Sequence, residues 1–233
     1  MRTLNYRTVI TFLASILILI SANSYSQEIK PYFDESKISP KLIDNPALPG
    51  SQKYKREVKY VINLQRNPDI DSIDEAFAER HYKPEMVSKF VDKRLTRQKY
   101  PKLYKLLDKA YKTSKVVTSK AKHYWDLKRP YVAIKEINPL IAAHASPSFP
   151  SGHTTESYVS ARVLSMIFPK KKNEFLERAK EVSDHRVLVG MHLPQDIEAG
   201  RQLSLLIIGS LVQNKHFLKD LKKAKKEVAD IDK

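Results

Sequence analysis

The sequence predicts an all-α, single-domain helical bundle. From Tyr54 onward, apolar residues recur at the three- and four-residue spacing of a helix, and no stretch shows the strict alternation of a half-buried strand. Only five of the 233 residues are glycine, whereas all-β folds of this size are rich in turns. Hydrophobic residues make up 42 % and charged residues 29 % of the chain, which is typical of a soluble globular protein with one sizeable core.

Residues 1–26 predict a secretory signal peptide. A positively charged start precedes the apolar stretch Val9–Ile20, and small residues occupy the −3 and −1 positions of the expected cleavage site, so that Gln27 would begin the mature chain. The apolar stretch is shorter than the roughly 20 residues of a membrane span, although an uncleaved anchor remains the alternative. A periplasmic or secreted location follows. The residues that carry this pattern are Arg2, Arg7, Ser24 and Ser26.

Residues 27–52 predict an irregular arm, because four prolines interrupt any regular helix there. A helical domain is then expected over residues 53–233. Its second helix should begin at Asp71 or Ser72, since a capping residue is followed there by acidic residues. The early helices, each marked by apolar residues at helical spacing, are expected over Glu57–Leu64, Ser72–His81, Pro84–Leu95, Tyr100–Tyr111 and Val116–Trp125.

The second half alternates long helices with proline-marked connections. Three prolines predict a loop over Ile134–Pro150, and Pro169 ends the helix that follows this loop. The stretch Leu203–Val212 is the most apolar of the mature chain, but it is short and indicates a buried helix. The later helices are expected over Thr154–Phe168, Asn173–His185, Gln195–Val212 and Phe217–Val228, the last being charged and amphipathic.

The net charge of +16 favours anionic partners: phosphates, nucleic acid or an acidic membrane surface. The alternative is a well-solvated surface with no partner. The sequence has no cysteine, which excludes disulfides, a thiol nucleophile and a thiolate metal site within it.

Lys122 and Arg129 form the first of three candidate site segments. They are seven residues apart, which is two helical turns, so they project from one face if the helix persists. Pro130 is expected to end the helix at this point. Two cations beside a helix end can clamp a phosphate, with the arginine as a bidentate donor. A solvated helix face is the simpler alternative.

Ser151–Gly152–His153 forms the second segment, between the proline-rich loop and the start of a helix. A helix start offers free backbone N–H groups and the positive end of the helix dipole, and glycine lets the backbone approach an anion. The Ser151 hydroxyl can donate to the same anion, and His153 can protonate a leaving oxygen. An ordinary capped helix start with a surface histidine explains these residues equally well.

The third segment contains Arg186, His192 and Asp196. A carboxylate four residues after a histidine, across a turn into a helix start, can accept one ring N–H and leave the other nitrogen free to attack. Asp196 could also be a simple helix cap, and His192 a loop residue. In combination, the three segments supply charge neutralisation, an oriented nucleophile and an acid, which is a complete set for phosphoryl transfer.

These segments resemble the three-part signature of the type 2 phosphatidic acid phosphatase superfamily, which includes the vanadium haloperoxidases. Three stretches carry the resemblance: His123–Asp126 with Arg129–Pro130, then Phe149–Thr154, then Gly190–Gly200. These stretches are most similar to bacterial class A non-specific acid phosphatases, and the similarity extends from Lys122 to the C-terminus.

The resemblance implies a helical bundle of the acid phosphatase and vanadium haloperoxidase type, with a role for each matched residue. It implies that His192 is the nucleophile that forms a phosphohistidine, that Asp196 orients it, and that His153 protonates the departing alcohol. It implies no metal and no cofactor. The phosphate oxygens would be held by Lys122, Arg129, Ser151, Gly152 and Arg186.

Two departures from the family pattern bear on substrate preference. The residue before the arginine of the third segment is usually serine, and here it is His185. The loop before the second segment reads Ser146–Phe149 in place of the Gly-Ser-Tyr usual in class A enzymes. Of the histidines outside the signature, His144 could line the pocket. The others, interpreted as surface or loop residues, are His81, His123 and His216.

The predicted function is a secreted, metal-independent acid phosphatase that hydrolyses small-molecule phosphate monoesters through a phosphohistidine. Three alternatives remain: a lipid phosphate or isoprenyl diphosphate phosphatase on the same fold, a vanadium haloperoxidase, and a non-catalytic basic protein that binds nucleic acid or an anionic surface. The complete site favours an enzyme and disfavours a nucleic-acid partner. A peripheral membrane contact and a homo-oligomer stay open.

Overall fold

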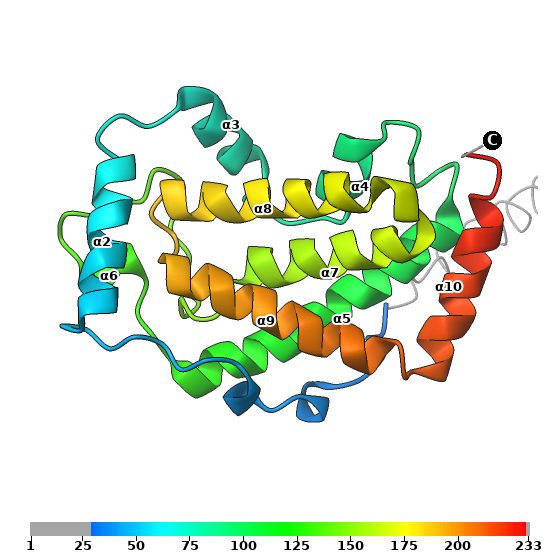
Figure 1. Cartoon of the computed structure of the whole chain (residues 1–233), viewed down its shortest axis with the longest axis horizontal. Coiled ribbons are helices and arrows are strands. Elements are labelled where there is room, and N and C mark those ends of the chain that lie inside the picture. Colours follow the sequence, from blue (N-terminus) through cyan, green and yellow to red (C-terminus); the bar gives the residue numbers. More distant parts are fainter. Residues whose placement is uncertain (1–28, 232–233) are drawn as a thin grey trace, which may run out of the picture.

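The computed structural model describes residues 29–231, and these residues form a bundle of α-helices without strands, which confirms the predicted fold class. Helix α7 (Gly152–Ile167) runs through the middle of the bundle. Figure 1 shows it between α8 (Lys172–Leu188) and α9 (Pro194–Leu211), with α5 (Pro101–Trp125) behind. The predicted leader lies outside the described residues.

Helix α7 can occupy the centre because nearly every side of it is suited to burial. Val159, Val163 and Leu164 are fully buried, and small residues between them let neighbouring helices approach closely. Closer to the start of the helix, the hydroxyl of the buried Ser157 donates to the carbonyl of Ala179 on α8 and so satisfies its own polarity across the helix interface. Buried helices of this kind fix the bundle, and the site lies at the N-terminal end of α7.

Helix α5 is one continuous helix of 25 residues, where two shorter helices were expected. The polar stretch between the two expected helices does not interrupt it. The hydroxyls of Thr113 and Ser114 donate back to the carbonyls of Lys109 and Tyr111, both at 2.7 Å. These residues therefore stay helical while buried, because their side chains are satisfied within the helix.

Helix α5 ends at Trp125, as expected for the helix over Val116–Trp125, and does not continue to Pro130. Asp126 adopts a left-handed conformation (φ 44°) and its N–H bonds the carbonyl of Lys122, which is a C-terminal cap. The helix therefore does not persist to Arg129, so the condition for Lys122 and Arg129 to project from one helical face is not met. The chain instead turns after Trp125 and brings the two cations together from a helix and a loop. Pro130 begins the short helix α6 (Pro130–Ala133).

Three shorter helices lie around this core: α2 (Gln52–Leu64), α3 (Ile70–Ala78) and α4 (Glu85–Val91). The cap of α3 is Asp69, whose carboxylate accepts from the N–H of Ser72, so the expectation of Asp71 or Ser72 is wrong by two or more residues. The last helix, α10 (Lys215–Glu227), packs against α5.

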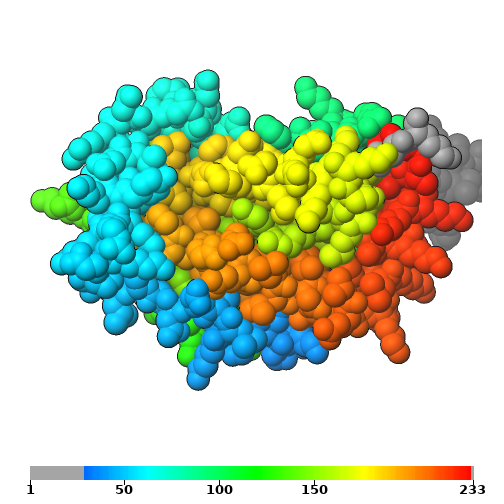
Figure 2. Space-filling model, viewed as in Figure 1, coloured from blue at the N-terminus to red at the C-terminus, as the bar shows by residue number. Residues whose placement is uncertain are grey.

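The described part of the N-terminal arm lies along the bundle and forms two 3-10 turns, η1 (Glu35–Lys37) and η2 (Pro40–Leu42). A third, η3 (Pro169–Lys171), joins α7 to α8. Tyr32 stacks edge-on against Phe217 of α10. Asp44 exchanges two hydrogen bonds with Gln202 of α9, and Figure 2 shows the arm against this helix. No helix within residues 29–231 combines the length and apolar character that a membrane span requires.

Gly200 is the point of closest approach between α9 and the start of α7. A Cβ at this position would lie 2.8 Å from the carbonyl oxygen of Ser151 and 3.0 Å from Cβ of Thr154. We expect Gly200→Ala to cost about 1–3 kcal/mol through overpacking, with Tm falling by roughly 2–4 °C per kcal/mol. Thermal unfolding followed by circular dichroism measures this change.

Gly209 supplies the matched control on the same helix, because a Cβ there meets nothing within 4 Å. Gly209→Ala should leave Tm unchanged or raise it, since alanine is favoured over glycine in a helix by up to about 1 kcal/mol. Equal Tm values for the two variants would contradict the close approach at Gly200.

Candidate active site

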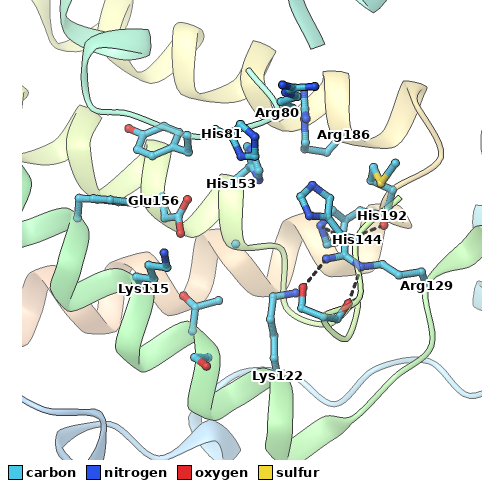
Figure 3. Close-up of a pocket in the computed structure, with 17 residues that line it drawn as sticks. Arg80, His81, Lys115, Lys122, Arg129, His144, His153, Glu156, Arg186 and His192 are labelled. Atoms are coloured by element: carbon cyan, nitrogen blue, oxygen red, sulfur yellow. Dashed lines mark hydrogen bonds between the residues drawn. The ribbon is translucent and has the colours of Figure 1, made fainter. Parts of the chain in front are cut away.

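A cavity of about 340 Å³ opens where the start of α7 faces α5, the end of α8 and the loop after α3. Figure 3 shows that cationic and imidazole side chains surround it. Six of the predicted site residues line the cavity: Lys122, Arg129, Gly152, His153, Arg186 and His192. The folding of the chain thus brings together residues from three separate segments of the sequence.

His192 and Asp196 form the predicted pair at the start of α9. The Nδ1 atom of His192 lies 3.1 Å from a carboxylate oxygen of Asp196. The same oxygen accepts from the N–H of Leu193, because Asp196 is also part of the capping box that begins α9. Asp196 therefore caps α9 and also contacts His192, and this geometry is compatible with both interpretations, helix cap and histidine orienter.

The contacts of His192 also define its tautomer. Nε2 lies 2.8 Å from a guanidinium nitrogen of Arg129, which can only donate. Nε2 is therefore the acceptor, and Nδ1 carries the proton toward Asp196. Burial lowers the pKa of His192 well below its ordinary value, and the charge of Arg129 adds to this effect. The ring is thus neutral, with a lone pair on the nitrogen that lines the cavity.

Ser148, to which the sequence analysis gave no role, contacts both His192 and Asp196. The hydroxyl of Ser148 donates to the Asp196 carboxylate and lies 3.4 Å from Nδ1 of His192. Burial raises the pKa of Asp196, whereas the Ser148 bond opposes this rise. Ser148 belongs to the loop that departs from the family pattern, so this loop is in direct contact with the His192–Asp196 pair.

The same loop holds two of the cations. Arg129 donates to the carbonyl of Ser146 at 2.9 Å and to the carbonyl of Met191 at 3.0 Å. The Nζ atom of Lys122 donates to the carbonyls of Pro147 and Ser148. Burial lowers the pKa of Lys122 to about 7, with Arg129 as a further cause. An anion in the cavity would offset the effects of burial and of Arg129, raise the pKa of Lys122 and so favour its charged form.

Arg186 provides the clearest indication of an anion site. Its side chain is 1 % exposed. One terminal nitrogen donates to the carbonyl of Ala76 at 2.7 Å and to Glu79 at 3.2 Å. The other two nitrogens, Nε and Nη1, are buried without a hydrogen-bond partner. Buried donors are rarely left unpaired, since each costs about 1–3 kcal/mol, so the guanidinium is poised for an anion in the cavity that it lines.

The start of α7 places Gly152 in the cavity wall, with Ser151 behind it. Ser151 is the helix cap: its Oγ accepts from the N–H of Thr154, and its own N–H bonds the carbonyl of Asp196. The Ser151 hydroxyl is fully buried and does not line the cavity. In this geometry Gly152 faces the anion space directly, while Ser151 ties the start of α7 to Asp196.

His153 is held from a direction that the sequence did not indicate. Its Nε2 lies 2.9 Å from the carbonyl oxygen of Glu79, the residue that caps the end of α3. Nε2 is therefore the donor, which leaves Nδ1 for other contacts. Burial lowers the pKa of His153 to about 3, and Arg186 is the next largest cause.

Residues 110–220 match the family model of the PAP2 superfamily. This part of the chain is therefore similar to the PAP2 superfamily. A curated non-specific acid phosphatase of Providencia stuartii is 32 % identical over 144 residues, which are 60 % of this chain and 58 % of the relative. One from Salmonella typhi is 32 % identical over 120 residues, 48 % of this chain and 47 % of the relative. The chain thus matches about half the length of these relatives.

A solved structure supports the same fold. The crystal structure of a bacterial vanadium-dependent iodoperoxidase superposes with a TM-score of 0.57 at 18 % identity, covering 74 % of this chain and 53 % of the other. The resemblance inferred from the three sequence segments is therefore confirmed.

Outside the matched region, Glu79 is the main residue around the cavity that sequence reasoning missed. It is 2 % exposed. Its carbonyl holds His153, and its carboxylate bonds Arg186, Arg178 at 2.6 Å and His185 at 3.0 Å. His185, the residue that replaces the usual serine, is thus paired with Glu79.

The cluster around Glu79 is the group of histidine and carboxylate side chains in residues 29–231 that comes closest to a metal-ligand arrangement. Glu75, Glu79 and His185 bring one ligand atom each within 4.8 Å of one another. However, guanidinium groups of Arg178 and Arg186 already bond these two carboxylates. The carboxylate charges are therefore compensated by arginine.

Two histidines outside the signature also line the cavity. His144 does so, as considered from the sequence, and its ring lies 6.4 Å from that of His153. His81 is an exposed residue on the loop after α3, as interpreted, but it faces the cavity as well. Arg80 and Lys115 add positive charge, so the cavity attracts anions from several sides.

Proposed function

We propose that this protein is an acid phosphatase that hydrolyses small-molecule phosphate monoesters through a phosphohistidine on His192, without a metal. The observation that carries the proposal is the pair of unsatisfied donors on buried Arg186, in the same cavity as the Nε2 lone pair of His192. A phosphate group can accept hydrogen bonds from the unsatisfied donors of Arg186, and its phosphorus is the electrophile for the lone pair of His192. The curated relatives named above are acid phosphatases by name.

In the first step, the phosphate dianion enters among Lys122, Arg129 and Arg186. Arg129 then exchanges its contact with Nε2 of His192 for a phosphate oxygen, which frees the lone pair. Nε2 forms a bond to phosphorus, and the bond from phosphorus to the ester oxygen breaks. Asp196 stabilises the ring as it gains positive charge, since Nδ1–H already points at its carboxylate.

His153 supplies the proton for the departing alkoxide. Before substrate binds, this ring is neutral, because burial and Arg186 hold its pKa at about 3. The two negative charges of a bound phosphate reverse the effect of the surrounding cations and raise this pKa. The substrate thereby promotes protonation of its own general acid, and Nδ1–H donates to the leaving oxygen while Nε2–H stays on Glu79.

In the second step, water hydrolyses the phosphohistidine. His153, now neutral, takes a proton from the water, whose oxygen bonds phosphorus as the bond from phosphorus to Nε2 breaks. Inorganic phosphate leaves and His192 regains its lone pair. The lowered pKa of His192 suits an enzyme of acidic surroundings, because the nucleophile stays unprotonated at a pH where ordinary histidines are charged.

The test is a panel of phosphate esters with the purified protein, from acidic to neutral pH. We expect hydrolysis of an aryl phosphate, inhibition by vanadate, which mimics the five-coordinate transition state, and full activity with a chelator present. Absence of hydrolysis across the panel would refute the proposal, and loss of activity with chelator would refute its metal independence.

We also propose that the enzyme acts in the periplasm or outside the cell, on the basis of the leader predicted over residues 1–26. Cell fractionation of the full chain, with a variant in which residues 2–26 are deleted as control, tests this location. Activity found in the cytoplasm for both forms would contradict it.

A further inference from the structure

One acidic side chain lies in this otherwise cationic cavity. Glu156 is on α7, one helical turn beyond His153, and is 8 % exposed. It lines the cavity, yet no hydrogen bond or ion pair joins its carboxyl group to another residue in the described part of the chain. Burial raises its pKa to about 8. Buried carboxyl groups are almost always hydrogen-bonded, so the partner of Glu156 is water or a ligand group in the cavity that it lines.

Glu156 borders the phosphate space on the side of the general acid. A Cβ built on Gly152 would lie 3.9 Å from Oε1 of Glu156 and 3.8 Å from Cε of Lys122. The carboxyl group is thus beside the residue that faces the phosphate. Because His153 protonates the leaving oxygen, a group next to His153 and beyond the phosphate meets the leaving alcohol.

Lys115 faces Glu156 from α5. Figure 3 shows these two residues on the side of the cavity away from Arg129. Lys115 is the largest electrostatic influence on Glu156, although the two form no ion pair. The space between them therefore offers a donor on one wall and a carboxyl group, which can accept or donate, on the other.

The chemistry of this space selects among leaving groups. A cationic amine would meet Lys115 and Lys122, the two cations that act on Glu156, and a second anionic group would meet the carboxyl group of Glu156 when ionised. An apolar chain would leave the carboxyl group unpaired at a cost of about 1–3 kcal/mol. A hydroxyl group can donate to Glu156 and accept from Lys115 at the same time, and it carries no charge.

We propose that Glu156 and Lys115 form a leaving-group subsite that recognises a hydroxyl group of a polyhydroxylated alcohol, so that phosphate monoesters of polyols and sugars are the preferred substrates. This inference rests on the phosphatase function proposed above and names its substrate class.

The test compares two esters whose alcohols share a three-carbon skeleton: terminal glycerol phosphate and propyl phosphate. For the unaltered protein we expect kcat/KM to favour glycerol phosphate by roughly 10- to 100-fold, the discrimination that a site built for a hydroxyl can provide. Glu156→Leu should bring this ratio close to one. Glu156→Gln, which keeps a donor and an acceptor in the same shape, should retain most of it.

The matched control is Glu177→Leu, the same substitution at an exposed glutamate of α8, which should keep the ratio of the unaltered protein. A ratio near one in the unaltered protein, or a ratio that survives in Glu156→Leu, overturns the subsite while hydrolysis of both esters upholds the phosphatase function. If neither ester is hydrolysed, the phosphatase function fails. The Kd values of the two esters, from calorimetry, then decide the subsite alone: equal values overturn it, and tighter glycerol phosphate binding that Glu156→Leu removes supports it.

Discussion

Replacing His192 by alanine lowers kcat/KM for an aryl phosphate by more than about 10⁴-fold, as expected for loss of a nucleophile whose partners act as a unit with it. The reason is specific to the geometry: Nε2 of His192 is the acceptor nitrogen, while Nδ1 contacts Asp196, whose carboxylate also accepts from Ser148. Steady-state kinetics of the purified variant measures the loss.

The His192→Ala variant needs proof that it folds, because the side chain is 2 % exposed and its removal leaves a cavity. Circular dichroism and Tm give this proof. His123→Ala, at an exposed position on α5, is the matched histidine control and should keep full activity. Activity of His192→Ala within tenfold of the unaltered protein would exclude His192 as the nucleophile.

A second measurement separates a nucleophile from a residue that only binds phosphate. Brief mixing of the unaltered protein with a radiolabelled phosphate ester, followed by quenching in alkali, should leave label on the protein. His192→Ala should retain none. Label that persists in this variant would place the covalent intermediate on another residue.

The fold could be predicted where burial and helical spacing agree. Residues of α7 and α9 show a clear apolar pattern with a cap or a proline at their ends, and both helices begin and end within two residues of the expected positions. The prediction failed at Thr113 and Ser114, because their polarity suggests a break. Only the structure shows that their hydroxyls bond back to the helix.

The candidate site could be predicted as far as it lies in local motifs. His192 with Asp196, and Gly152 with His153, are each within four residues of one another, so the chain itself determines their relative positions. Glu79 could not be found in this way. It lies 74 residues before His153 and acts through a backbone carbonyl as well as its side chain, and a carbonyl leaves no mark in the choice of residue type.

The joint role of Glu79 also explains why a departure from the family pattern can be tolerated. A histidine in place of serine before Arg186 introduces a larger, titratable side chain into a buried region. Its Nδ1 atom contacts the carboxylate that also holds Arg178 and Arg186. The substitution therefore adds a contact to the network behind the phosphate site and does not enter the cavity itself.

Replacing His153 by alanine should lower kcat far more for an alkyl phosphate than for an aryl phosphate. With an alkyl phosphate, whose alkoxide leaves poorly without a proton, we expect His153→Ala to lower kcat by about 10²–10⁴-fold. With an aryl phosphate that releases a stable nitrophenolate, the loss should be far smaller, since that group departs unprotonated. The ratio of the two kcat values, in the variant and in the unaltered protein, is the measurement.

The dependence of kcat on pH tests the role of His153 as general acid independently. A general acid must be protonated, so kcat for the alkyl ester should fall as pH rises through the pKa of His153 in the substrate complex. That pKa lies above the value of about 3 in the free protein, because the phosphate dianion stabilises the imidazolium. In His153→Ala this alkaline decline should disappear. An equal loss for both esters, with the decline retained, would instead assign His153 to positioning Gly152 and the start of α7, and the acid would have to be sought among the other side chains that line the cavity.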